Sequence, residues 1–178
     1  HGMSDSPYSL RAIGERLHRD GAHVLGLRLP GHGTAPSGLL EFTRKVTALR
    51  TAHPVFRRRR FFDGRPTGNG HHMRDIYWLT RDGVEMTSDD WHSGIKSVAV
   101  GLNGEALQEP DARGERIVDD SFLLCFNAHA YPVEFVVPET PYAKDWKGVL
   151  DTFDPRGATA ATVTSGTTIT VQGRSVLV

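Results

Sequence analysis

The sequence predicts a mainly β protein, an antiparallel β-sandwich with an N-terminal helix-strand-helix extension. From residue 61 to residue 178, short apolar or alternating runs recur between turn signals, a spacing typical of antiparallel sandwiches. Two segments with helical periodicity precede that region. A chain of 178 residues has room for one core of ordinary size but hardly for two independent ones. We therefore expect one sandwich domain that carries an extension.

The first part of the extension favours a helix followed by a strand. Apolar residues recur at helical spacing between Pro7 and Arg19, and Asp20-Gly21 is a stop signal. The run AHVLGLRL, residues 22–29, alternates like a short strand, and the loop PGHGTAPSG follows it. A lone strand with unpaired backbone groups is costly to bury. We therefore expect residues 22–29 to pair with a sandwich edge or a second copy of the chain, outside any parallel sheet.

A second helix is predicted from about Leu39 to Ala52. Phe42, Val46 and Leu49 fall on one stripe of this helix, and Pro54 ends the helical pattern. We expect this stripe to lie on the sandwich with part of it uncovered. An exposed apolar stripe invites self-association, so the pattern predicts a homo-oligomer through this region.

Seven runs in the third region are predicted to contain the strands. They are DIYWL, SVAVGL, SFLLCFNA, VEFVV, KGVLDTF, TTITV and SVLV. Tyr77 and Trp78 are adjacent in the first run, so their side chains point to opposite faces, and we expect Trp78 in the core. The single cysteine, Cys125, lies in an apolar run and is expected to be a buried, inert thiol.

The charge balance argues against binding to nucleic acid or membrane. Lys plus Arg equals Asp plus Glu at 21 each, so no global field attracts a polyanion. The run Arg57–Arg60 is expected to be a solvated approach to a strand. The sequence has neither an apolar stretch of membrane-spanning length nor a signal-peptide pattern, and we expect a soluble, cytoplasmic protein.

Residues 40–178 contain many sequence segments that occur in the same order in one known family. These segments include FFDGRP, DIYWLTRDGVEMTSDDW, VGLNG, ERIVDDSFLLCFNAHAYPVEFVVP, LDTFDP and GRSVLV. This region resembles the C-terminal region of bacterial glycogen debranching enzymes of the isoamylase and GlgX type. The resemblance implies a helix and linker over residues 40–60 and a β-sandwich over 61–178. It also implies that the glycosidase carboxylates belong to a preceding barrel, so we assign no such role to Asp89, Asp90, Asp119 or Asp120.

Residues 1–39 carry a different pattern, with His1-Gly2 at the start and PGHG after the predicted strand. This stretch resembles the N-terminal part of an α/β-hydrolase, an esterase or lipase fold. The resemblance implies that the backbone N–H of Met3 is an oxyanion donor. The nucleophile pattern G-x-S-x-G does not occur in the sequence. The chain therefore resembles a chimera joined near residues 38–40.

The leading functional hypothesis is a stand-alone accessory β-sandwich of a carbohydrate enzyme. It would lack glycosidase activity and bind glucan weakly at most, with Trp91 and Trp146 as the candidate sugar-stacking residues. We expect no cofactor and no metal, because the histidines of HH and DDWH lack a fixed ligand spacing. A calcium ion at the carboxylates around Asp89 and Asp90 is the open exception.

The alternative hypothesis is a small hydrolase of carboxylic esters or lactones. An improvised site in or next to residues 1–39 would use Ser4, Ser6, Asp5 and His32 as its catalytic groups. A hydroxyl, an imidazole and a carboxylate within hydrogen-bond reach are the minimum for acyl transfer. The sequence alone leaves open whether the protein is an enzyme.

Overall fold

The computed structural model describes residues 11–20, 38–66, 74–139, 141–154, 157 and 161–178. The chain forms two compact units, His1–Val46 and Thr47–Val178. In the first unit, α1 spans Arg11–Arg19, which confirms the expected helix over its described part. The strand expected at 22–29 lies outside the described residues. None of the helices in the described part of the chain has the length and apolarity needed to cross a membrane.

The second helix, α2, forms where the sequence predicts it. It spans Gly38–Ala52, and the chain then turns at His53 into the 3-10 helix η2, Pro54–Arg57. Proline fits the first position of a helix because its missing N–H would have no partner there. No residue of α2 is buried.

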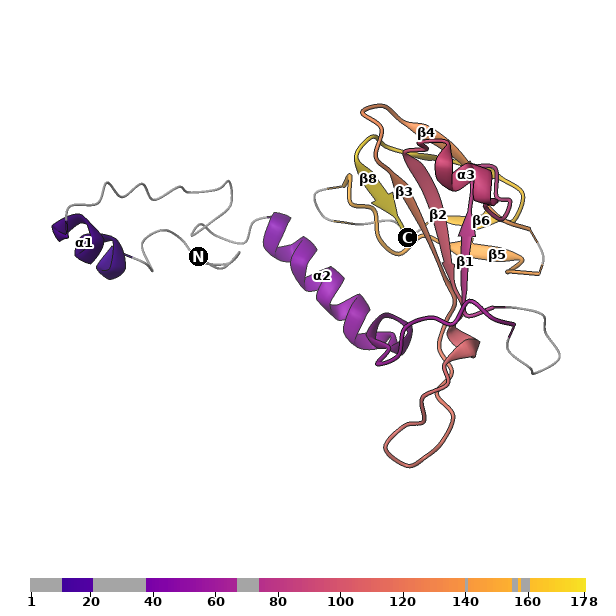
Figure 1. Cartoon of the computed structure of the whole chain (residues 1–178), viewed down its shortest axis with the longest axis horizontal. Coiled ribbons are helices and arrows are strands. Elements are labelled where there is room, and N and C mark those ends of the chain that lie inside the picture. The colour runs from indigo at the N-terminus through magenta and orange to yellow at the C-terminus, as the bar shows by residue number, and fades with distance from the viewer. Residues whose placement is uncertain (1–10, 21–37, 67–73, 140, 155–156, 158–160) are drawn as a thin grey trace. The chain divides into compact units, whose positions relative to one another are not determined.

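The unit Thr47–Val178 is built mainly from short strands (Figure 1). Two further short helices interrupt them: α3, Ser88–His92, and the 3-10 helix η3, Gly104–Ala106. The strands are β1 Ile76–Leu79, β2 Ser97–Leu102, β3 Phe122–Asn127, β4 Val133–Val136, β5 Asp145–Lys147, β6 Thr162–Thr164, β7 Thr168–Val171 and β8 Ser175–Leu177.

All strand pairs in the described part of the chain are antiparallel, which confirms the predicted fold class. One sheet has four strands in the order β1-β2-β3-β8, and two smaller sheets are β4-β7 and β5-β6. Within the first sheet, β2 pairs with all of β3, whereas β8 reaches only Cys125–Asn127. The half of β3 that contains Phe122 and Leu123 therefore has no ladder partner on the β8 side.

The predicted run KGVLDTF is wrong as a strand. Only Lys147 lies in a strand, β5. The residues after it form no regular strand, although backbone N–H groups of Val149, Leu150 and Thr152 donate hydrogen bonds to the carbonyl groups of Val178 and Val176, beside an isolated bridge between Asp151 and Leu177. The partner strand β6 was missed because its segment, Thr162–Thr164, has one apolar residue, Val163. A single apolar residue gives no periodicity to detect.

The main core lies on one face of the four-stranded sheet. Tyr77, Leu79 and Cys125 pack there with Phe135 and Val171 of the β4-β7 sheet. All five are nearly inaccessible, with Phe135 and Leu79 each 1% exposed. The prediction of a buried Cys125 is confirmed.

The opposite face of the same sheet has a smaller cluster of its own. Val55 of η2 is buried there against Val100, Leu102 and Phe122, and Leu49 of α2 packs at its border. The expected packing of the helical stripe is confirmed for Leu49. Phe42 and Val46 belong to the other unit, so their packing stays a prediction.

Trp78 also lies on this second face, and the expectation that it is a core residue is wrong. Strand alternation places Tyr77 inward at 6% exposure and leaves Trp78 at 41%. The opposed directions of these two neighbours are confirmed.

A buried ion pair fixes the segment that leads into β1. Asp75 is fully buried, and its carboxylate accepts hydrogen bonds from Arg58 Nη2 and from the backbone of Asp63 and Gly64, each at 2.9 Å. The Arg58 guanidinium also lies 4.2 Å from the centre of the Phe62 ring. The expectation of a solvated run at Arg57–Arg60 is therefore wrong for Arg58.

Candidate functional site

Two tryptophans form an exposed aromatic pair on the second face of the four-stranded sheet. Trp78 and Trp91 are 41% and 53% exposed, and their ring centroids are 5.3 Å apart at an interplanar angle of 71°. This edge-to-face arrangement is a favourable geometry for aromatic rings. The pair, called here the Trp78–Trp91 platform, leaves large apolar ring surface in contact with solvent.

A capping box on α3 holds Trp91 in place. The Thr87 hydroxyl accepts a hydrogen bond from the Asp90 N–H at 3.4 Å, and the Asp90 carboxylate accepts one from the Thr87 N–H at 2.7 Å. The sequence TSDD carries this signal directly. Hydrogen bonds from the Thr87 backbone, and then from its hydroxyl, lower the pKa of Asp90.

These contacts give Asp90 a structural role at the start of α3. One of its carboxylate oxygens, Oδ2, already accepts both Thr87 hydrogen bonds. Asp89, beside it, is exposed. The calcium ion considered for this pair stays a prediction.

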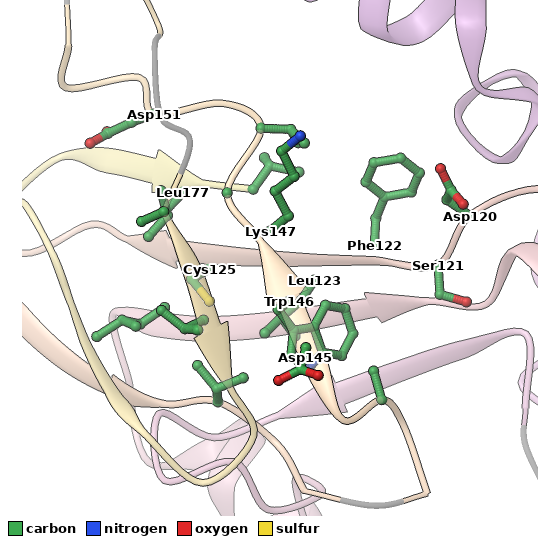
Figure 2. A pocket seen from close by; sticks show the side chains of 18 of the residues that line it. Asp120, Ser121, Phe122, Leu123, Cys125, Asp145, Trp146, Lys147, Asp151 and Leu177 are labelled. Carbon is green, nitrogen blue, oxygen red and sulfur yellow. The ribbon is translucent and has the colours of Figure 1, made fainter.

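Trp146, the second candidate for sugar stacking, lies in a different place. It is half-buried on β5 and packs against the main core, on the face of the four-stranded sheet opposite to Trp78. Figure 2 shows its ring beside Leu123, in the wall of a cavity of about 880 Å³. The structure therefore does not bring Trp91 and Trp146 together.

A polar cluster that the sequence interpretation did not single out joins η2 to the segment before β3. The Asp119 carboxylate lies 2.8 Å from His53 Nδ1 and accepts the Val55 N–H at 2.9 Å and the Asp120 N–H at 2.8 Å. Among the described residues, His53, Asp119 and Asp120 offer potential metal ligands within 4.8 Å of one another. Both oxygens of Asp119 already have protein partners, so these contacts are explained by anchoring of η2.

The residues proposed for ester hydrolysis lie outside the described part of the chain. They are Met3, Ser4, Asp5, Ser6 and His32. In the described part, Cys125 is a poor nucleophile because burial raises the pKa of its thiol to about 12. The hydrolase hypothesis therefore stays a prediction.

Comparison with known proteins identifies the family of most of this unit. Residues 75–178 match the family described as "Isoamylase, C-terminal". Proteins named "Glycogen operon protein GlgX homolog" from Mycobacterium tuberculosis and Mycobacterium bovis are 60% identical to this chain over 141 residues, which are 79% of the chain and 20% of each relative. An "Isoamylase" of Pseudomonas amyloderamosa is 23% identical over 141 residues, 79% of the chain and 16% of that protein. The chain thus spans about a fifth of the length of the curated relatives it matches.

Proposed function

Because the chain belongs to the isoamylase C-terminal domain family, we propose that its β-sandwich is a non-catalytic accessory domain of a glycogen-processing enzyme. We further propose that it binds α-glucan weakly through the Trp78–Trp91 platform. The observation that carries this proposal is the exposure of two packed indole rings at 41% and 53%. Such rings offer flat apolar surface of the kind that the C–H face of a pyranose covers.

The polar groups near Trp91 support the choice of a hydroxylated ligand. Ser88, Asp89 and His92 lie on the same short helix and are exposed. His92 has one ring nitrogen, Nδ1, 2.6 Å from the Ser88 carbonyl oxygen, which fixes the orientation of its ring. These groups can exchange hydrogen bonds with sugar hydroxyls, but they do so in water, where the net gain per bond is small. We therefore expect a dissociation constant of roughly millimolar order.

The contacts of Asp90 and Asp119 agree with a role without glycosidic cleavage. Cleavage requires two carboxyl groups that face each other across the bond, with one acting as acid. The Asp119 carboxylate already contacts His53 and accepts the Val55 N–H of η2. The Asp90 carboxylate already accepts the Thr87 N–H in the cap of α3. Neither is available for transfer of a proton to a leaving group.

Electrophoresis of the whole chain through gels that contain glycogen tests the proposal. We expect glycogen to retard the unmodified protein, and we expect Trp91→Ala to move as it does in a gel without glycogen. Tyr131→Ala is the matched control, because Tyr131 is an aromatic residue of similar exposure, 59%, whose ring contact is with His129 and not with either tryptophan of the platform. Equal retardation of the Trp91 and Tyr131 variants would reject the platform as the site.

A second assay separates this proposal from the ester-hydrolase alternative. The pure protein is incubated with a short-chain nitrophenyl ester, and release of nitrophenolate is followed. The accessory role predicts no turnover above buffer. Turnover that disappears in Ser4→Ala, Ser6→Ala or His32→Ala would instead support catalysis by residues 1–39.

A further inference from the structure

The second face of the four-stranded sheet is apolar along all three of its longest-paired strands. The side chains that β1, β2 and β3 direct to this face are Ile76, Trp78, Val98, Val100, Leu102, Phe122, Leu124 and Phe126. A sheet face in water normally carries polar side chains at these positions. The cluster around Val55 covers one end of the face, where Val100 and Phe122 are buried. Within the described part of the chain, the other end remains uncovered.

The uncovered end forms a strip that begins at the Trp78–Trp91 platform. Trp78 pairs with Val100 on β2, and Val98, two residues earlier, pairs with Phe126 on β3. These pairings place the side chains of Trp78, Val98 and Phe126 on one face, along an oblique line across the three neighbouring strands (Figure 1). Trp78 and Phe126 are 41% and 37% exposed, and Val98 between them is half-buried. We call Trp91, Trp78, Val98 and Phe126 the sheet strip.

The sheet strip is long and narrow. Neighbouring strands lie about 4.8 Å apart and residues along a strand about 3.3 Å apart, so the Cα atoms of Trp78 and Phe126 are about 12 Å from each other. Buried Val100 bounds the strip on one side. On the other side is exposed Lys96, whose carbonyl oxygen accepts the Ala128 N–H and so extends the β2-β3 pairing. The strip is therefore one row of side chains wide, about 7 Å.

These dimensions favour a linear oligosaccharide over other occupants. Each partner in a stable protein interface buries about 800 Å², several times the area of a strip about 7 Å wide. A disaccharide can reach Trp91 and Trp78, whose ring centroids are 5.3 Å apart, but it is too short to lie on Phe126 as well. A chain of several sugar units is narrow enough and long enough to cover all three rings.

We propose that the glucan site continues from the Trp78–Trp91 platform across the sheet to Phe126, and that it holds a stretch of several glucose units rather than the end of a chain. Phe126 is then a further stacking residue, because its flat apolar ring can take the C–H face of a pyranose. This inference rests on the proposed function of the platform and adds the length of chain that the site recognises.

Titration of the whole chain with maltose and with maltohexaose tests the inference. Intrinsic tryptophan fluorescence reports binding, because Trp78 and Trp91 are exposed. We expect Phe126→Ala to weaken maltohexaose binding roughly 3- to 10-fold, the worth of one ring contact, and to leave maltose binding unchanged. We expect Trp91→Ala to weaken the binding of both sugars.

Two further substitutions at Phe126 separate stacking from packing. Phe126→Tyr keeps a flat ring and should bind maltohexaose as the unmodified protein does. Phe126→Leu keeps an apolar side chain without a ring and should bind as Phe126→Ala does. Phe61→Ala is the matched control, because Phe61 is an exposed phenylalanine whose ring contact is with Phe62 and not with the sheet strip.

The outcomes distinguish failure of this inference from failure of the proposed function. If Trp91→Ala weakens binding but Phe126→Ala binds maltohexaose as tightly as Phe61→Ala does, the platform stands and its extension to Phe126 is wrong. Equal weakening of maltose and maltohexaose binding by Phe126→Ala also overturns the extension. Absence of saturable binding of either sugar by the unmodified protein rejects the platform, and the extension with it.

Discussion

At the scale of single residues, alternation in β1 shows what could be predicted from sequence and what could not. The neighbours Tyr77 and Trp78 were expected on opposite faces, and they are, because side chains alternate in any strand. Which face is covered depends on packing between distant segments, so Trp78 was placed in the core wrongly. No sequence pattern predicted that Asp75 is buried in an ion pair. Its partners Arg58, Asp63 and Gly64 are 11 to 17 residues away in sequence, so no local motif joins them.

Two buried acids make the stability of the protein sensitive to alkaline pH. Burial raises the pKa of Cys125 from its ordinary 9.0 to about 12, and it raises the pKa of Tyr77 from 10.0 to about 12. Between the unfolded and the folded pKa values, the folded protein holds protons that the unfolded chain has lost. The stabilising contribution is thus complete below pH 9, and it is lost as the pH rises from 9 toward 12 for Cys125 and from 10 toward 12 for Tyr77.

Urea unfolding from pH 7 to pH 11 measures this effect. We expect Cys125→Ala to abolish the decline that begins near pH 9, and Tyr77→Phe to abolish the part that begins near pH 10. Cys125→Ala also lowers the free energy of unfolding by an amount that does not vary with pH, because it leaves a small gap in the core. If the free energy of unfolding depended on pH in the same way in both variants and in the unmodified protein, the decline could not be assigned to Cys125 and Tyr77.

At the scale of elements, the strands with the most apolar sequences were the ones predicted. SVAVGL corresponds to β2 and TTITV contains β7, since both runs have β-branched residues between turn signals. The β5-β6 pair was not foreseen, because Asp145–Lys147 and Thr162–Thr164 contribute one apolar residue each. No sequence pattern predicted the cavity beside this pair either.

The short helix η2 depends on one carboxylate for its position. Asp119 accepts the Val55 N–H and lies 2.8 Å from His53 Nδ1, so Asp119→Ala removes both contacts. Loss of a partly buried acceptor costs about 1–3 kcal/mol, and we expect that decrease in the free energy of unfolding. We also expect faster hydrogen exchange at the Val55 amide. Asp120→Ala is the control, and an equal effect on this amide would show that Asp119 is not its anchor.

At the scale of the whole molecule, the helix α2 carries the prediction of self-association. It has no buried residue, although Phe42, Val46 and Leu49 form an apolar stripe along it. Leu49 already packs on the sheet, and burial of Phe42 and Val46 against a second copy would remove further apolar surface from water. We expect sedimentation velocity to show a dimer or a larger oligomer that Val46→Asp dissociates. A protein that sediments as a monomer at high concentration, with or without the substitution, would contradict this expectation.

The pairing of β3 with β8 also determines when the sheet can form. Cys125 pairs with Leu177, about fifty residues later in the chain. During synthesis, β1, β2 and β3 leave the ribosome well before β8, so the four-stranded sheet remains incomplete while the intervening segment is made. Contacts between such distant segments form slowly, because a long loop must close first. The nascent chain therefore exposes the β8 side of β3 while residues 128–174 are made, and this edge is where binding of a chaperone would be most useful.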